Sequence, residues 1–454
     1  MSLASLLSIA RSAMFAQQSA MSVTAHNIAN AQTLGYSRQR IQLSAAAPQL
    51  TPTGPVGRGV TEVGIQRVRD SFFDSRYRSE SGLLGNSATM GDFLGQVEAA
   101  INEPSTNGLS VLLDGFFGSF ANLANNPASP TSRSLVQQAG RRFVQRLQQL
   151  DATVHQVADG ALAQMREQVG QVNDLARRIG ELNQQILSSG GVNGISPDLQ
   201  DQRDVLVDQL SSLVGVRVLD RNDGTIGLAA GDTILVDGAN SQTLAVNPLA
   251  GGGFGLITVG GGTMDPKSGS LRALCELTTT TLPGIQAQLD TLARTLVTTV
   301  NAIHRSGFTL NGTTNTDFFD PAGVTAQSIA LAPAVAASGD AIAAAGIAAA
   351  GDGTIAQQLA ALATTGVAAL GGRSFRDFYI DLSGVIGAGV SGASQDAAAY
   401  QAMVDQADTL RASESGVSVD EEMVALISQQ QAYAAAARIV NVANEMMQSV
   451  LQMI

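Results

Sequence analysis

The placement of proline constrains this chain more than any other feature of its sequence. All twelve prolines lie between Pro48 and Pro333. Because proline breaks the interior of a helix, the 47 residues before this interval and the 121 residues after it are free to form long helices. Both ends of the chain therefore predict extended helices.

Apolar residues recur at alternating steps of four and three at both ends. Six of eight such positions near the start are apolar, and these positions hold Leu3, Leu7, Ala10, Met14, Gln17, Met21, Thr24 and Ile28. Nine of eleven near the end are apolar, and these hold Val419, Met423, Leu426, Gln430, Tyr433, Ala437, Val440, Asn444, Met447, Leu451 and Ile454. This spacing is typical of a helix that packs along a partner helix. We expect the two terminal helices to pair; the alternative is that each packs on its own domain.

A further long helix is predicted in the middle of the chain. Residues 131–189 contain no proline and carry apolar residues at helical spacing throughout. Two successive four-residue steps centred on Met165 break the heptad, so a supercoil would relax there. A shorter apolar stripe over residues 285–303 is expected to pack against this helix.

Short β-strands are predicted in a glycine-rich stretch, residues 216–262. The turn signals Asn222-Asp223-Gly224 and Asp237-Gly238 separate its β-type runs, which indicates one or two hairpins. Residues 60–68 form another predicted strand. Residues 306–372 are rich in Gly, Ala, Thr and Asp, and their organisation is not predicted.

Together these patterns predict a mainly α fold, a long coiled-coil or bundle of helices with paired terminal helices and small β-hairpins. We divide the chain into a first coiled-coil helix, a middle helical domain, an Ala/Gly-rich segment, returning helices of the middle domain, and a second coiled-coil helix. The ranges of these parts are 1–45, 46–305, 306–372, 373–414 and 415–454.

Composition argues against several partners and locations. The chain has 26 basic and 38 acidic residues, a net charge of −12, and no basic run, so nucleic acid is not an expected partner. No Sec-type signal is readable at the start. The longest apolar run, residues 341–350, is about half the length that a bilayer span needs. The single cysteine, Cys275, rules out an internal disulfide framework and a cysteine-based zinc cluster.

Residues with catalytic chemistry are scattered, so we expect neither an enzyme nor a cofactor. His26, His155 and His304 lie far apart, and the hydrolase, zinc-protease and nucleotide-binding motifs are missing. A calcium-loop opening near residues 220–224 has Gly231 where the bidentate acid should stand. Acids at positions 420–422 suit a helix start, where they complement the unpaired N–H groups.

One stretch after the first predicted helix supports a specific resemblance. Residues 27–30 read Asn-Ile-Ala-Asn, and residues 33–39 read Thr-Leu-Gly-Tyr-Ser-Arg-Gln. This stretch closely resembles bacterial flagellar axial proteins, and its Tyr-Ser-Arg-Gln ending resembles the hook-associated protein 1 family. Further matches follow in chain order at 57–60, 65–70, 199–204, 270–301, 419–423, 430–433 and 445–446.

The resemblance implies a structural adaptor at the hook–filament junction of the bacterial flagellum. Such a protein is exported through the flagellar type III apparatus, lies outside the cell and polymerises as a ring. The implied partners are other copies of the chain, hook protein, hook-associated protein 3, and an export chaperone at the carboxyl-terminal helix, but no membrane. Two alternatives are another axial protein, such as a hook or rod subunit, and a secreted coiled-coil effector.

The residues expected to carry assembly lie in the terminal stripes and in the motif after the first helix. They are Leu7, Met14, Met21, Ile28, Asn30, Thr33, Gly35, Tyr36, Arg38, Met423, Leu426, Tyr433, Val440, Met447 and Leu451. Four polar residues inside the stripes are expected to help set the register of the pair, namely Gln17, Thr24, Gln430 and Asn444.

The chain departs from the resembled family at one point. Longer members carry an outer β domain after the element that Phe318-Phe319-Asp320 resembles. Here only about fifty Ala/Gly-rich residues follow before Leu370. We expect the outer domain to be reduced or missing.

Overall fold

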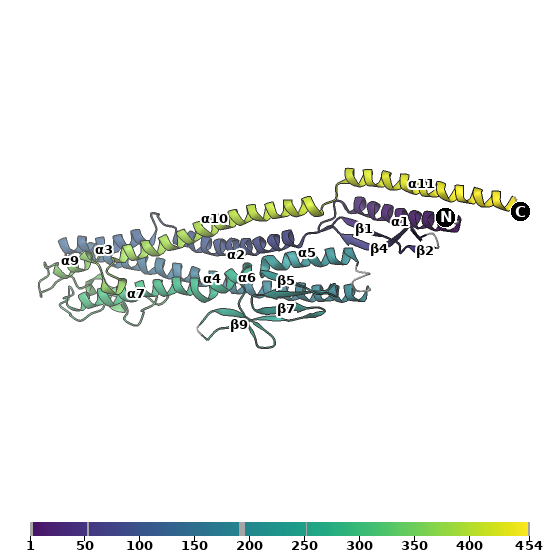
Figure 1. Cartoon of the computed structure of the whole chain (residues 1–454). Coiled ribbons are helices and arrows are strands. Elements are labelled where there is room, and N and C mark those ends of the chain that lie inside the picture. Colours follow the sequence, from purple (N-terminus) through teal and green to yellow (C-terminus); the bar gives the residue numbers. More distant parts are fainter. Residues whose placement is uncertain (1–2, 52–53, 190–195, 251, 453–454) are drawn as a thin grey trace.

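The computed structural model describes residues 3–51, 54–189, 196–250 and 252–452. Figure 1 shows an elongated molecule, in which a rod of helices continues at one end into a projecting pair formed by the first and last helices. The fold is mainly α-helical with paired terminal helices and small antiparallel sheets. This confirms the predicted fold class.

Helix α4 (Pro130–Ser188) is the long helix predicted in the middle of the chain, and it runs for 59 residues. Ser129 caps its start by accepting a hydrogen bond from the N–H of Ser132 (3.3 Å), and Pro130 occupies the first turn. Its buried residues recur at helical spacing along the whole length. The helices packed against it include α3 (Leu109–Asn125), α5 (Pro197–Leu213) and α7 (Leu282–Arg305). The stripe over 285–303 therefore packs on this helix, as predicted.

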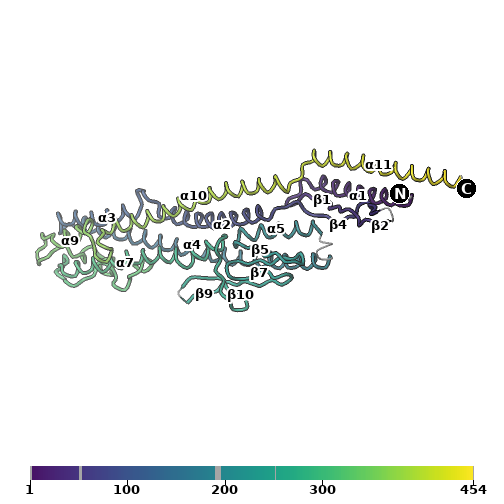
Figure 2. The backbone as a smooth tube through the Cα atoms, in the orientation of Figure 1, coloured from purple at the N-terminus to yellow at the C-terminus, as the bar shows by residue number. Residues whose placement is uncertain are grey.

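Two further long helices complete the rod. Helices α2 (Ser71–Ile101) and α10 (Phe375–Ser415) lie side by side, with α10 returning toward the projecting pair (Figure 2). Asp70 caps α2 by accepting from the N–H of Phe72 (2.8 Å). Helix α6 (Ser270–Glu276) continues through a π-helical turn (Leu277–Thr281) into α7.

Among the described residues, the predicted hairpins form two antiparallel sheets beside α4. One has the order β5-β6-β7-β8 and the other β11-β10-β9. Their strands are β5 (Val216–Asp220), β6 (Ile226–Ala230), β7 (Thr233–Asp237), β8 (Asn240–Ser241), β9 (Leu244–Pro248), β10 (Phe254–Thr258) and β11 (Thr263–Met264). Two asparagines of α4 hold them: Asn183 donates to the carbonyls of Ile226 (2.9 Å) and Gly238 (2.7 Å), and Asn173 exchanges two hydrogen bonds with the backbone of Leu244.

Residues 306–372 form an irregular cap at the far end of the rod. Its short helices are α8 (Pro333–Ala337), α9 (Thr354–Ala361) and two 3-10 turns, Gly339–Ala341 and Ala368–Leu370. The rings of Phe318 and Phe319 lie 5.5 and 5.8 Å from that of Phe116, and all three are fully buried. Aromatic packing therefore orders a segment whose sequence shows no period.

His304 connects α7 to this cap. Its Nδ1 donates to the carbonyl of Thr316 (2.7 Å), and its Nε2 accepts from the N–H of Ala343 (2.8 Å). These two contacts require the neutral ring with its proton on Nδ1. Burial, with a smaller contribution from Arg133, lowers the pKa of His304 to about 4, although Thr316 and Asp317 act in the opposite direction.

Acid is therefore expected to destabilise the cap through His304. Because the pKa is lower in the folded state, the unfolded chain takes up the proton first as the pH falls below about 6.5. The free energy of unfolding should fall by roughly 3 kcal/mol between pH 6.5 and pH 4. Urea unfolding at several pH values measures the slope of the free energy of unfolding against pH. This slope should flatten in His304→Gln and persist in His155→Gln. An unchanged slope in His304→Gln would show that the acid effect does not come from His304.

A narrow β-ribbon lies beside the first helix, α1 (Leu3–Asn30). Strand β1 (Gln39–Ala45) pairs antiparallel with β4 (Val60–Arg67), and β2 (Gln49–Thr51) pairs with β3 (Gly54–Val56). The strand predicted over residues 60–68 is confirmed. The ribbon leads from the terminal helices back into α2.

Candidate assembly surface and elbow

The terminal helices α1 and α11 (Val419–Gln452) pack against each other in opposite directions (Figure 1). Near the rod, Asn27 Nδ2 donates to Glu422 Oε2 (2.9 Å), and Gln429 Nε2 donates to Thr24 Oγ1 (3.1 Å). Alanines supply much of the buried area, namely Ala10, Ala16, Ala20, Ala436 and Ala443. Small side chains allow the two backbones to approach closely.

The contact face of α11 matches the predicted stripe only in part. Its buried and partly buried residues follow steps of four and three, with Ala425 and Ala437 beside the main row. They are Glu422, Ala425, Leu426, Gln429, Tyr433, Ala436, Ala437, Val440 and Ala443. The predicted positions among them are Leu426, Tyr433, Ala437 and Val440. The predicted positions that are exposed instead are Val419, Met423, Gln430, Asn444, Met447 and Leu451. Ile454 lies outside the described residues.

The predicted stripe of α1 lies at the edge of its buried face. Leu7, Met14, Met21 and Ile28 are all partly buried, whereas the fully buried face carries mostly small residues. Of the polar stripe positions, Thr24 bonds to Gln429, which supports its expected influence on register. Asn27, which the stripe omits, makes the closer contact with α11.

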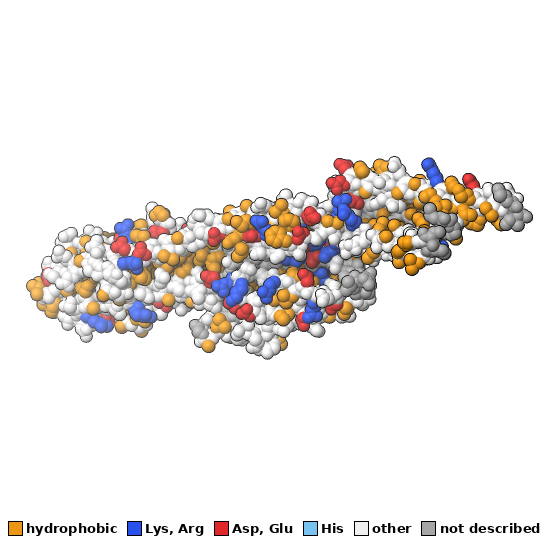
Figure 3. Space-filling view, viewed as in Figure 1, with side chains coloured by type: hydrophobic (Ala, Val, Ile, Leu, Met, Phe, Trp, Pro, Cys, Tyr) orange, Lys and Arg blue, Asp and Glu red, His pale blue; other side chains and the backbone are white. Residues whose placement is uncertain are grey.

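A second apolar face of α11 points away from α1. Its members are between 43 and 69% exposed, and they are Val424, Ile427, Ile439, Val442, Met446 and Val450. Figure 3 shows hydrophobic side chains gathered at this end of the molecule. Figure 1 also shows α11 extending beyond the amino end of α1. The pair therefore presents an apolar surface that the monomer leaves uncovered.

The chain turns sharply after α1, and we call residues 31–38 the elbow. Thr33 Oγ1 donates to Asn30 Oδ1 (3.2 Å), and Tyr36 Oη donates to Asn27 Oδ1 (2.8 Å). Gly35 has a φ of 78°, in the left-handed region that favours glycine. The predicted residues Asn30, Thr33, Gly35 and Tyr36 thus hold the shape of this turn.

Arg38 ties the elbow to the start of α11. Its Nε donates to Glu422 Oε1 (2.7 Å), its Nη1 to Glu421 Oε2 (3.2 Å), and its backbone N–H to the carbonyl of Ser415 (2.8 Å). The Glu422 side chain is 4% exposed and also accepts from Asn27. Glu421 and Glu422 therefore bind Arg38 of the elbow, in addition to complementing the unpaired N–H groups at the start of α11.

The elbow is also bound to the rod through α5. Asp201 accepts from the N–H and the hydroxyl of Ser37 (both 2.8 Å), and Arg67 Nη1 donates to it (2.7 Å). The same Arg67 nitrogen donates to Asp204 (2.7 Å). One carboxylate therefore joins the elbow, strand β4 and helix α5.

Asp204 lies at the centre of an ion cluster that continues into α2 and α10. Besides Arg67, its carboxylate lies 3.3 Å from Arg69 and 3.4 Å from Arg78. Arg78 and Arg411 both bind Asp208, at 2.6 and 2.5 Å. Burial would raise the pKa of Asp204, but Arg69, Arg67, Arg78 and Arg203 hold it well below its usual range.

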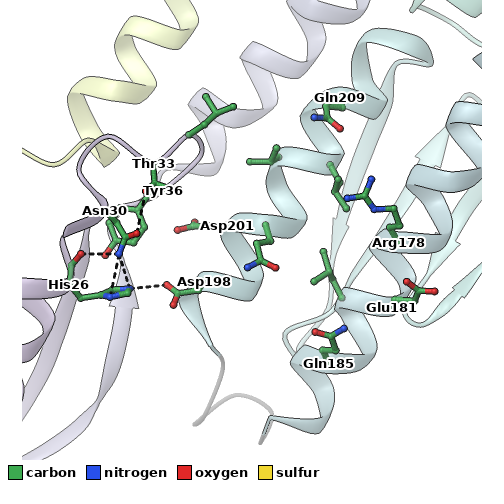
Figure 4. Close-up of a pocket in the computed structure, with 15 residues that line it drawn as sticks. His26, Asn30, Thr33, Tyr36, Arg178, Glu181, Gln185, Asp198, Asp201 and Gln209 are labelled. Carbon is green, nitrogen blue, oxygen red and sulfur yellow. Dashed lines mark hydrogen bonds and ion pairs between the residues drawn. The ribbon is translucent and has the colours of Figure 1, made fainter. Parts of the chain in front are cut away.

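A pocket of about 710 Å³ is lined by the elbow, by α5 and by α4, with α5 in the middle (Figure 4). On one side, Asp198 contacts His26 Nε2 (3.3 Å) and accepts from Gln39 Nε2 (2.7 Å). On the other side, α4 contributes Arg178 and Glu181. Its walls bring together parts of the chain that are distant in sequence.

The motifs quoted for the resemblance converge here. Residues 27–39, 65–70, 199–204 and 419–423 all contribute to the elbow or to the ion cluster next to it. Sequence reasoning matched these segments separately and missed the pairing of Arg67 with Asp201 and Asp204. The arginines and aspartates inside the matched segments were the available signal.

Gly35→Ala is expected to destabilise the elbow by about 1–3 kcal/mol. The added Cβ would stand 2.2 Å from Val205 Cγ2 on α5, and the positive φ disfavours any side chain. Urea unfolding measures the loss, and limited trypsin digestion after Arg38 and Arg40 should become faster. Gly57→Ala is the control, because its Cβ would meet nothing within 4 Å. Equal behaviour of the two variants would contradict this account.

Comparison with known proteins identifies the family. The family model described as the flagellar hook-associated protein FlgK helical domain matches residues 94–319. Flagellar hook-associated protein 1 of Bacillus subtilis is 32% identical over 493 aligned residues, which cover 98% of this chain and 97% of that protein. This chain belongs to the flagellar hook-associated protein 1 (FlgK) family. The family is one of structural flagellar proteins.

Other comparisons extend this result. The family member from Salmonella typhimurium is 29% identical over 70% of this chain, and the match spans 59% of that longer protein. A solved structure of the flagellar hook junction protein FlgK from Burkholderia pseudomallei has the same fold, with a TM-score of 0.66, 17% identity, and coverage of 76% of this chain and all of that chain. In addition, a basal body rod protein model matches residues 7–36, and a model of the carboxyl-terminal part of the rod FlgEFG proteins matches 399–453.

None of the described helices combines the length and the hydropathy that crossing a bilayer requires.

Proposed function

We propose that this protein joins hook to filament as a structural adaptor and assembles into a ring through its terminal helices. The observation that supports this proposal is the second apolar face of α11, because an exposed stripe of this size is characteristic of a protein interface. Residues 1–45 and 415–454 would form the inner layer of a tubular assembly. The middle helices and hairpins would form the outer layer.

The neighbours along the axis would be hook protein on one side and hook-associated protein 3 on the other. The protein would act outside the cell after export through the flagellar type III apparatus. A chain with one cysteine and thinly packed terminal helices suits passage in an unfolded state. The terminal pair would then complete its packing on assembly.

Aspartate on the outward face of α11 is expected to block assembly while the rod stays folded. Ile427→Asp combined with Val442→Asp places two charges on a face that a neighbour would bury. Expressed in a strain lacking the native protein, this variant should leave hooks without attached filaments and release filament protein into the medium. Val385→Asp, on an exposed part of α10, is the control and should restore filaments. Normal filaments from the α11 variant would contradict the proposal.

An export chaperone is proposed to cover α11 before secretion. The exposed apolar residues of this helix are the surface that such a protein would bind. Pull-down of the full chain and of a chain lacking residues 420–454, against the flagellar export chaperones of the same bacterium, tests this. Equal capture of both would place the chaperone site elsewhere.

A second candidate is a hook or rod subunit, because rod-protein models match both ends of the chain. A deletion strain separates the two functions. An adaptor at the junction predicts intact hooks with shed filaments, whereas a hook or rod subunit predicts that hooks are absent.

A further inference from the structure

A cleft on the side of the rod is rich in basic groups, although the chain has a net charge of −12. It measures about 660 Å³ and lies between α2, α5 and strands β5 and β6. Its basic residues are Arg67, Arg69, Arg78, Arg203, Arg217 and Lys267. Its acidic residues are Asp74, Asp204 and Asp220.

Most of the basic residues that line this cleft have a carboxylate partner. Arg67, Arg69 and Arg78 each lie within ion-pair distance of at least one aspartate. On the rim, Lys267 pairs with Asp265 (2.6 Å). Arg203, in the floor, is different.

Arg203 is the buried arginine of this cleft for which the described residues offer no ion pair. It is 4% exposed, and no carboxylate among the described residues lies within ion-pair distance of it. Its Nη1 donates to Asn183 Oδ1 (3.1 Å) and to the carbonyl of Gly224 (3.0 Å), but its Nε–H has no hydrogen-bond partner among the described residues. Burial, with Arg67 and Arg78, lowers the pKa of Arg203 to about 10, against the attraction of Asp204. A buried donor of this kind is costly until an acceptor arrives.

Hydroxyl groups line one wall of the same cleft. Ser71, Ser75 and Ser79 follow one another at four-residue spacing on one side of α2, and Ser268 adds another hydroxyl. Guanidinium and hydroxyl groups together are the donors that bind the oxygens of phosphate, sulfate or carboxylate.

We propose that this cleft binds one oxyanion group, held by Arg203 and its neighbouring arginines with hydroxyls of α2. The group supplies a negatively charged partner and a hydrogen-bond acceptor to Arg203, which has neither a close carboxylate nor an acceptor for its Nε–H among the described residues. It comes either from a free inorganic ion or from a carboxylate on a second copy of the chain.

Thermal unfolding of the full chain tests the site. In sodium phosphate, compared with sodium chloride at equal ionic strength, the unfolding temperature should rise and saturate, by about 2 °C at ten times the dissociation constant. Ser75→Glu places a carboxylate in the cleft and should abolish the phosphate effect, as should Ser79→Glu. Ser134→Glu, at an exposed position of α4, is the matched control and should keep it.

Analytical ultracentrifugation distinguishes the two sources. A phosphate effect with unchanged sedimentation supports a free ion. A carboxylate from a second copy is supported if the chain self-associates in a concentration-dependent way and phosphate abolishes this association. Ser75→Glu should then not self-associate. Two results overturn the site. One is that phosphate raises the unfolding temperature no more than chloride does. The other is that Ser75→Glu and Ser79→Glu both keep the phosphate effect of the unmodified chain.

Discussion

Asp204→Asn is expected to lower the free energy of unfolding by about 3–5 kcal/mol, because removing one partner leaves buried charges uncompensated. Asp204 faces Arg67, Arg69 and Arg78 at 2.7 to 3.4 Å. Asparagine keeps the shape of the side chain but removes its charge. Urea is the suitable denaturant, because guanidinium salt would screen the cluster.

The matched control for this variant is Asp159→Asn, an aspartate exposed on α4. Its effect should stay within about 0.5 kcal/mol. If Asp204→Asn fell in the same range, the remaining aspartates would be sufficient to hold the arginines, and the central position assigned to Asp204 would be wrong.

Arg38→Glu is expected to release α11 from the elbow. The variant places a third carboxylate beside Glu421 and Glu422, of which Glu422 is buried. Loss of a buried pair costs about 3–5 kcal/mol, which corresponds to roughly a 150-fold to 5,000-fold loss of protection in α11. Amide hydrogen exchange of the full chain measures this, with the amides of α4 as an internal reference.

Two further variants test whether the effect comes from this ion pair. Arg38→Glu combined with Glu422→Arg should recover part of the protection, since a pair forms again while Asn27 loses its acceptor. Glu421→Gln should change little, because that side chain is 67% exposed. No recovery in the combined variant would contradict the assignment of the effect to the pairing of Arg38 with Glu422.

The helices of this protein could be predicted because the spacing of apolar residues indicates a buried helix face even when the element that packs on it is unknown. This succeeded for α4 and for both terminal helices. It failed for the register of α11, which carries apolar residues on two faces. The pattern counted the large residue Met423, which is 44% exposed, whereas the buried apolar residues of α11 are Ala436 and Ala443.

The ion cluster beside the elbow and the order of the cap could not be predicted in the same way. Arg67 and Asp204 are 137 residues apart, and Arg411 and Asp208 are 203 apart. No local pattern shows that such residues meet. In the cap, order comes from aromatic contacts and from single side chains such as His304, which bond to the backbone and leave no period.

The position of the two chain ends affects how the molecule can be labelled. Both lie beyond the elbow, within the pair of helices that we assign to the inner layer. A fluorescent protein fused to either end would occupy that layer. A motility defect in such a fusion would then come from steric obstruction of the inner layer by the fused domain and not from a loss of function of the chain itself. The exposed turn at residues 347–351, at the opposite end of the rod, is the better place for a dye or an epitope.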